Sequence, residues 1–484
     1  MNPSITAAST RWAALAAFVV FCLLCLLAQR HGVRLSFDSY YYVEYAKEFR
    51  QHLPQSFGTA WPFGWPLLGS VAGVLGLSAY HGLLAWSVAS VAGLFLLARP
   101  LVPWEQIGLV GGGLLLSAMG TYAFTTVVAG VLSETSFAFV LLAFACCLGR
   151  WPEPRAIVFS AGLALAAFCL RYAGGLAFVM LFVWGLFQLG QLRATGRLPL
   201  ALLAGATASA IAAGLLAWNI AATGGLVSNH PIVRPSPTHW LGIASDFGWS
   251  LPSLLGAHGL LQVLGFTSAA RLSVGLALAA GMITVGWLGW RRARRPEIRA
   301  LGFLVVGYTI GLIVLRCFNE FDDLYSARMF VPLLMPCFLL GGWLVPAPKV
   351  VVAACTGVLV LNVGLCSRGA SQQVSADVRS AVSIVAAARS DELIAINDPA
   401  VTLSAQVTQA VVRAPGMPDP RWSKVRYVVI AAVPLDREGQ SSVFPATGSQ
   451  LVAALLASGR FQTRLHDSQV IVLEQLPFPS SPSR

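Results

Sequence analysis

Long apolar runs constrain the fold of this chain more than any other feature. A membrane-spanning helix needs about 20 consecutive, predominantly apolar residues. Runs of roughly this length predict spans near residues 11–28, 80–98, 105–121, 133–149, 156–170, 174–191, 198–221, 271–290, 300–316, 328–345 and 349–366. Only 11% of the 484 residues are charged, whereas soluble domains carry about 25%. We therefore expect an all-α polytopic membrane protein with about 11 transmembrane helices, within a range of roughly 10 to 13.

Two shorter apolar stretches, 62–78 and 252–266, are interrupted by Gly and Pro and follow long polar connections. They predict juxtamembrane or re-entrant helices, the first of them in the first outer loop. Either stretch would add a span if it crossed the membrane completely, and would then invert the topology that follows it.

Basic residues set the expected orientation, because Lys and Arg concentrate in short cytoplasmic connections. If the N-terminus is cytoplasmic, the cluster RRARRPEIR at 291–299 lies in such a connection, as do Arg99, Arg150, Arg155, Arg193, Arg197 and Lys349. We expect a multi-pass protein of the cell inner (plasma) membrane with a cytoplasmic N-terminus. The net charge of +12 is spread over these connections, and no compact basic domain is present to bind nucleic acid.

The two ends of the chain differ in character. Residues 1–366 hold the expected spans, whereas 367–484 read as a small soluble α/β domain on the extracytoplasmic side. In this tail, DELIAINDP and VRYVVIAA predict buried strands, VSADVRSAVSIVAAAR predicts an amphipathic helix, and QVIVLEQ predicts a closing strand. The final PFPSSPSR is expected to be disordered.

The first outer connection is rich in tyrosine and acid. It reads FDSYYYVEYAKEF over residues 37–49, directly after the first span. On a helix, one face would collect Asp38, Tyr41, Tyr45 and Phe49. Ionisable residues at membrane depth are costly, which makes Asp38 a candidate site residue. The structural alternative is that Asp38 caps this helix and that the tyrosines belong to an interfacial aromatic belt.

Three further charged residues lie at outer ends of expected spans. Glu134 opens the fourth span, Arg171 ends the fifth and Arg328 opens the tenth. Structural roles exist for these positions too: Ser133 would cap the fourth span, Glu134 suits a helix dipole, and Arg171 can snorkel. In the expected topology, however, two acids and two arginines face the same side of the membrane. That convergence predicts a site.

The residue types suit an amphipathic substrate with an anionic head group. A guanidinium offers a planar fork that matches phosphate, and a carboxylate can deprotonate an incoming hydroxyl. The candidate substrate-binding set is Tyr41, Glu44, Arg171, His230, Arg234, Tyr325 and Arg328. No Walker loop or GxGxxG is present, so a nucleotide donor is not expected. The sequence indicates no definite cofactor, and a divalent metal held by Asp38 with Glu134 or His230 is left open.

An ordered series of motifs resembles the C-type, polytopic membrane glycosyltransferases, specifically the bacterial relatives of protein O-mannosyltransferases and of the lipid A aminoarabinose transferase. The similar stretches are FDSYYYVEYAKEF, WPFGWPLLGSVAGVLG, VASVAGLFLLARPL, LSETSFAFVLLA, LRYAGGLAF and YSARMFVPLLMP. The resemblance covers about residues 1–366, and the tail is similar to the variable outer domain of the family.

The resemblance implies transfer of a sugar from a polyprenyl-phosphate donor to an acceptor lipid, glycan or protein of the cell envelope, outside the cytoplasm. By analogy, Asp38 would be the general base, Glu134 a second catalytic acid that orients the acceptor or a metal, and Arg171 and Arg328 ligands of the donor phosphate. The chain departs from the family pattern in having a single Asp38 instead of an Asp-Glu pair, and Met329 where Tyr is usual.

Two other functions are compatible with parts of this pattern. A transporter or lipid flippase for an envelope precursor would also place charges in a polytopic bundle, but such proteins tend to show internal repeats and polar residues near the bilayer midplane. A membrane scaffold with a partner-binding tail would leave the acidic first loop without a role.

Overall fold

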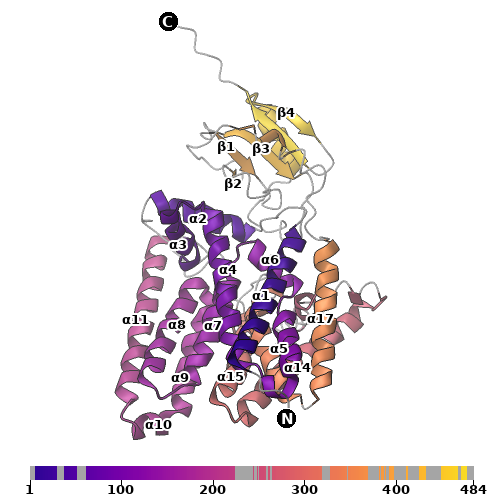
Figure 1. Ribbon diagram of the computed structural model, residues 1–484. Helices are drawn as coiled ribbons and strands as arrows, with labels where there is room; N and C mark the ends of the chain where they lie inside the picture. Colours follow the sequence, from indigo (N-terminus) through magenta and orange to yellow (C-terminus); the bar gives the residue numbers. More distant parts are fainter. Residues whose placement is uncertain are drawn as a thin grey trace. The chain divides into compact units, whose positions relative to one another are not determined.

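The computed structural model describes residues 6–29, 37–51, 62–223, 250–257, 264–318, 327–345, 347–368, 392–396, 410–412, 425–431, 448–466 and 470–476, with a few single positions between them. The described part is mostly helical, with one small sheet near the C-terminus (Figure 1). Packing divides the chain into two compact units. The first comprises Met1–Ala28, Glu48–Val128 and Leu132–Arg368, and the second Gln29–Lys47, Ala129–Val131 and Gly369–Arg484. The expected domain boundary at 366/367 stays a prediction.

The helices before the tail have the following bounds: α1 Ala7–Gln29, α2 Phe37–Gln51, α3 Gly64–Val71, α4 Ala79–Ala98, α5 Trp104–Ala118, α6 Tyr122–Ala129, α7 Glu134–Leu148, α8 Pro154–Leu170, α9 Gly175–Phe187, α10 Leu189–Ala194, α11 Leu198–Thr223, α14 Ser268–Arg292, α15 Pro296–Phe318, α16 Val331–Leu344 and α17 Pro348–Arg368. Short 3-10 turns join several of them: η1 Ala72–Leu75, η2 Arg99–Leu101, η3 Tyr172–Gly174 and η5 Ala327–Phe330. Local signals agree with these starts, because Ser78 and Thr267 cap α4 and α14 through their side chains.

The first unit is a bundle of apolar helices, and Figure 1 shows α8, α9 and α11 packed beside one another. Among the described residues, six helices are long and apolar enough to cross a membrane, or seven if a bent pair counts as one span. The helices of the bundle are buried to different degrees. In the most apolar 18-residue stretch of α15, 61% of the residues are buried, against 11% in that of α11. The chain is therefore an all-α multi-pass membrane protein, as its apolar runs predicted.

Each of the eleven apolar ranges expected to span coincides with a helix, but several of these helices are short. Glu134–Leu148, Pro154–Leu170, Tyr172–Phe187 and Arg328–Leu344 are apolar segments of 10–17 residues. The stretch 62–78 forms the short helix α3 with the turn η1, in keeping with a juxtamembrane or re-entrant element. The number of spans, about 11, stays a prediction.

A bend of 54° breaks the helix pair α5 and α6. The break would leave backbone N–H groups of α6 without partners inside apolar surroundings, which is costly. Asn362 of α17, fully buried, supplies the acceptor: its Oδ1 accepts from the N–H of Tyr122, the first residue of α6. Its Nδ2 donates to the Val358 carbonyl at 2.6 Å. One amide on a neighbouring span therefore satisfies the broken end.

The second unit contains a five-stranded mixed sheet in the order β2-β1-β3-β5-β4. The strands are β1 Leu393–Ile396, β2 Ala410–Val412, β3 Val425–Ala431, β4 Phe461–His466 and β5 Val470–Gln475, and helix α19 spans Gly448–Ala457. Strand β1 is parallel to both β2 and β3, whereas β5 is antiparallel to β3 and β4. The expected small α/β domain is thus present.

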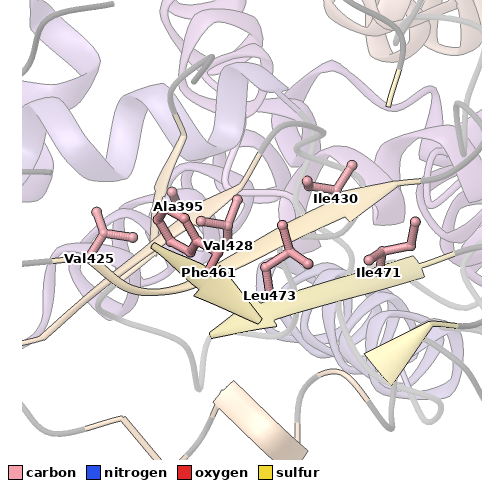
Figure 2. Close-up of a cluster of buried hydrophobic side chains, with 7 residues drawn as sticks. All are labelled: Ala395, Val425, Val428, Ile430, Phe461, Ile471 and Leu473. Atoms are coloured by element: carbon pink, nitrogen blue, oxygen red, sulfur yellow. The ribbon is translucent and has the colours of Figure 1, made fainter. Parts of the chain in front are cut away.

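Alternating side chains on one face of this sheet form its core (Figure 2). The cluster consists of Ala395, Val425, Val428, Ile430, Phe461, Ile471 and Leu473. Val452 and Leu455 of α19 pack against it. Period-2 alternation places Val428 and Ile430 of β3, and Ile471 and Leu473 of β5, on the same face. Val425 has the opposite parity, and the register of β3 against β1 shifts between Val425 and Tyr427.

The tail differs from its sequence reading in one respect. QVIVLEQ was expected to close the sheet, yet β5 lies between β3 and β4, and β4 forms the edge. Strand β4 reads FQTRLH and exposes most of its residues, so its sequence lacks the apolar run that would have revealed it. Most of the expected helix at 374–389 and the C-terminal 477–484 lie outside the described residues.

Candidate functional site

Glu134 is the first residue of α7 and is fully buried. The preceding Ser133 makes no capping hydrogen bond, contrary to its expected role. Its hydroxyl instead accepts from Nη1 of Arg171 at 3.3 Å. The start of α7 therefore turns two polar side chains toward the end of α8 rather than toward its own backbone.

Arg171 follows the last residue of α8 in an extended conformation, with φ −152° and ψ 138°. The chain then folds back through η3, where the N–H of Gly174 donates to the Arg171 carbonyl at 2.7 Å. A Cβ on Gly174 would collide with the backbone of Ala167, so only glycine allows this close return. The turn in LRYAGG thus fixes the guanidinium at the end of the helix.

Arg328 lies in η5, immediately before α16, and reaches the same carboxylate. Its Nε lies 3.6 Å from Glu134 Oε1, and Arg171 Nη1 lies 2.5 Å from that oxygen. Both arginine side chains are 14% exposed and the glutamate side chain 1%. Arg171 Nη2 also donates to the Met329 sulfur at 2.9 Å. The structure therefore brings together three of the residues singled out in the sequence.

Glu134 leaves one of its two oxygens without a partner. Arg171 and Arg328 both approach Oε1, whereas Oε2 is buried and has no hydrogen-bond partner among the described residues. Helices α7 and α16 both begin at this point, and helix N-termini favour anions. The arrangement therefore places two guanidinium groups beside an acceptor oxygen that can take a further donor.

Aromatic side chains close the cluster on its inner side. Phe137, one turn beyond Glu134, packs on Tyr308 of α15 with ring centroids 6.0 Å apart. The Tyr308 hydroxyl donates weakly to the Met329 carbonyl at 3.5 Å. Phe330 is fully buried next to them. These residues exclude water from below, which strengthens charge interactions at the cluster.

Asp38 lies in the first turn of α2 rather than at its N-cap, and it is 7% exposed. Among the described side chains of α2, the buried ones are Asp38, Ser39, Tyr42, Val43 and Ala46. The expected grouping of Asp38 with Tyr41 stays a prediction, because the Tyr41 side chain lies outside the described part. At the other end of α2, Arg50 donates to the Gly69 carbonyl of α3 at 2.9 Å. Asp38 belongs to the second unit and Glu134 to the first.

The remaining predicted site residues are not placed. The side chains of Tyr41 and Glu44, within α2, and the residues His230, Arg234 and Tyr325 lie outside the described part of the chain. Among described residues, no group of three or more His, Cys, Asp or Glu side chains could hold a metal ion. The role of Met329 as a partner of Arg171 was not foreseen, although its position next to Arg328 was noted as unusual.

An apolar cavity of about 380 Å³ lies within the first unit. Residues of α5, α14, α16, α17 and the segment 251–255 line it. Helix α16 contributes Leu333, Leu334, Cys337, Phe338, Gly341 and Gly342, a set with the 3.6-residue spacing of one helix face. The helix that begins beside Arg328 therefore also forms a wall of this cavity.

No family model matches the chain, and no curated protein matches it. Its fold is similar to that of ArnT from Cupriavidus metallidurans in the apo state, with 13% identity, a TM-score of 0.46 and coverage of 96% of this chain and 98% of that one. The same protein bound to undecaprenyl phosphate gives 12%, 0.47, 98% and 100%. Arabinofuranosyltransferase AftD from Mycobacteria gives 15% and 0.43, with 98% of this chain matching 42% of that one.

Proposed function

We propose that this protein is a membrane glycosyltransferase that moves a sugar from a polyprenyl-phosphate donor to an acceptor on the extracytoplasmic side. The single observation that carries the proposal is the cluster in which Arg171 and Arg328 converge on one buried carboxylate. The acceptor lipid, glycan or protein belongs to the cell envelope.

The cluster suits a phosphate group. Its two guanidinium groups and the two helix N-termini favour an anion, and guanidinium groups bind phosphate through paired donors. Glu134 holds the two arginines at the edge of the apolar bundle and keeps them from spreading apart. Its unpartnered Oε2 is an acceptor suited to a sugar or acceptor hydroxyl.

The apolar cavity suits the rest of such a donor. An isoprenoid chain needs a lining without polar groups, and α16 presents one for about 14 Å, from Leu333 to Gly342, at 1.5 Å per residue. Since Arg328 precedes the same helix by only a few residues, head-group and tail contacts come from one continuous segment. An amphipathic ligand matches both.

In the proposed reaction, Asp38 takes the proton from an acceptor hydroxyl as the oxygen attacks the anomeric carbon of the donor. The bond between that carbon and the phosphate oxygen breaks, and polyprenyl phosphate leaves as the anion. Arg171 and Arg328 stabilise the negative charge that develops on the leaving phosphate. No nucleotide is consumed in this step.

Lipid analysis of cells that lack the protein tests the proposal. We expect a polyprenyl-phosphate sugar to accumulate, and re-expression of the wild-type chain to remove it. Purified protein should also bind undecaprenyl phosphate. An unchanged lipid profile together with no binding would refute the assignment, whereas sugar-lipid retained on one side of the membrane would point to a flippase.

Replacement of Asp38 by Asn tests the proposed base. Because the amide keeps the shape but cannot accept the proton, we expect sugar transfer to fall by about 100-fold or more. Undecaprenyl phosphate binding and thermal stability should remain near wild type. Wild-type transfer rates in the Asp38→Asn variant would remove this residue from the mechanism.

A further inference from the structure

The turn between α14 and α15 carries an unusual concentration of positive charge. Its residues Arg291–Arg295, called the arginine turn below, include four exposed arginines between two candidate spans, Ala269–Arg292 and Pro296–Leu315. No acidic residue forms an ion pair with the arginine turn in the part of the chain that the structure describes. This surface has no role in the proposed sugar transfer.

Two of the arginines, Arg291 and Arg295, make contacts within the protein. Arg291 lies over the Trp287 ring at 4.7 Å and near the Trp290 ring at 5.9 Å. Arg295 stacks on Trp343 at 5.3 Å, and both its terminal nitrogens lie 3.4 Å from the Pro100 carbonyl. These contacts hold the backbone of the arginine turn in one conformation.

Neighbouring indoles make this end of the bundle rigid. Trp343 donates to the Leu101 carbonyl at 2.6 Å, and Trp104 donates to the Arg99 carbonyl at 2.8 Å. With Arg295 on Pro100, the three consecutive carbonyls of η2 each accept a side-chain donor. The arginine turn is thus built on a fixed platform that joins η2, α5, α14 and α16.

The side chains of the other two arginines make no such contacts among the described residues. Arg292 and Arg294 are exposed, and within the described residues neither makes a hydrogen bond, an ion pair or a ring contact. They flank Ala293 at the point where α14 ends. Two exposed guanidinium groups two positions apart on this turn, without a counter-charge among the described residues, suit an anion with several oxygens.

The aromatic surroundings identify the class of anion. Trp287 is 43% exposed and lies one turn before the arginine turn. Tryptophan at the end of a span belongs to the head-group layer of a bilayer, where basic side chains meet anionic lipids. The surface that carries Arg292 and Arg294 is therefore also the surface in contact with lipid head groups.

We propose that Arg292 and Arg294 form a binding site for the head group of an anionic phospholipid, with Trp287 against its glycerol and upper acyl region. This assignment is independent of the proposed transfer reaction. It holds for whichever leaflet meets the arginine turn.

The test uses full-length protein in a neutral detergent, titrated with phosphatidylglycerol and, as reference, phosphatidylcholine, with bound lipid counted by native mass spectrometry. We expect tighter binding of phosphatidylglycerol. The double variant Arg292→Gln/Arg294→Gln should bind it about 30-fold more weakly, since each arginine near an anionic surface contributes about fivefold.

A matched control removes two equally exposed arginines elsewhere. Arg193, in the last turn of α10, and Arg197, just before α11, are exposed and have no aromatic partner among the described residues. The Arg193→Gln/Arg197→Gln variant should retain phosphatidylglycerol affinity. Equal losses in the two double variants would show that net charge alone governs binding and would overturn the site.

Two further outcomes bear on the ligand. Equal affinity for phosphatidylglycerol and phosphatidylcholine would overturn the proposal. Displacement of phosphatidylglycerol by millimolar inorganic phosphate would also overturn it, because the site would then be selective for free phosphate and not for a lipid. Retention of lipid in phosphate supports it.

Discussion

Two carboxylates in this protein each meet two arginines, but the two clusters differ in how their carboxylate oxygens are used. In the tail, Glu474 is bound by Arg426 through Oε1 and by Arg464 through Oε2, and Gln462 donates to Oε2 at 3.2 Å. In the helical bundle, Arg171 and Arg328 both address Oε1 of Glu134, and Oε2 has no partner among the described residues. One carboxylate is saturated and the other is not.

Exposure separates the two clusters as well. The tail arginines are 35% and 54% exposed, whereas those of the bundle are 14% exposed. Water screens the tail cluster, so its net contribution to stability is small. The bundle cluster lies where little water reaches it. A saturated ion cluster fastens strands together, whereas an unsaturated one in an apolar setting is suited to a ligand.

The largest expected contrast comes from removing each carboxylate. Glu134→Gln removes the carboxylate that both packed guanidinium groups face, so we expect a loss of about 3 kcal/mol in stability and a loss of sugar transfer of about 100-fold or more. Glu474→Gln should leave transfer unchanged. Thermal unfolding and transfer assays on the two full-length variants check this. Equal effects of the two changes would erase the distinction between the clusters.

The arginines should differ next most strongly. Arg328→Ala removes a charge-assisted contact to phosphate, so undecaprenyl phosphate binding should weaken by about 10- to 100-fold. Arg464→Ala should not change it. Arg328→Lys, which keeps the charge but loses the planar fork, should lie between them. Unaltered lipid affinity in Arg328→Ala would exclude this arginine from the site.

Low pH should lower the stability of the C-terminal sheet. Burial acts to raise the pKa of Glu474, but hydrogen bonds from Arg464 and Gln462 and the nearby arginine charges outweigh it, so the pKa lies below the ordinary 4.5. The folded pKa is below the unfolded one, so the stabilisation is fully present above about 4.5 and is lost as pH falls through the folded pKa. Hydrogen exchange of β3 and β5 amides in the full-length protein should accelerate over that range. In the Glu474→Gln variant this acceleration should be absent. If the variant showed the same pH dependence of hydrogen exchange as the wild-type protein, the pKa of Glu474 would not govern the stability of the tail.

The smallest effect concerns Met329. Its sulfur accepts from Arg171 without neutralising the guanidinium, so it orients the arginine while leaving the charge available. Met329→Leu keeps the volume and removes the acceptor. We expect undecaprenyl phosphate affinity to fall about two- to fivefold at an unchanged melting temperature. Met329→Gln, with a stronger neutral acceptor, should restore binding, and equal affinities in all three proteins would show that the contact has no role.

Much of the bundle could be predicted from the sequence because lipid imposes a simple rule on it. Each long apolar run became a helix, since no other element satisfies the backbone in such a run. The short helices around the site were harder to classify. Glu134–Leu148 is too short to span alone, and its length follows from packing with neighbours and not from its own composition.

The site was predictable in membership but not in geometry. Charge at span ends marked Glu134, Arg171 and Arg328 because such residues are costly there. Nothing in the sequence indicates that both arginines meet the same oxygen, or that Ser133 serves Arg171 instead of its own helix. Those contacts depend on the return of the chain at Gly174 and on tertiary packing. In the tail, the polar edge strand Phe461–His466 was not predicted, because its sequence lacks the alternating apolar residues that indicate a strand.

The amide of Asn362 has a consequence for how the chain is made. A polar side chain in an apolar span resists entry into the bilayer until it finds a partner. Here the partner, the N–H of Tyr122, precedes it by 240 residues in the sequence. Because α5–α6 is synthesised before α17, we expect the bent pair to lie in the membrane when α17 leaves the ribosome. The hydrogen bond from the Tyr122 N–H to Asn362 then stabilises α17, the last described helix of the bundle, as it inserts.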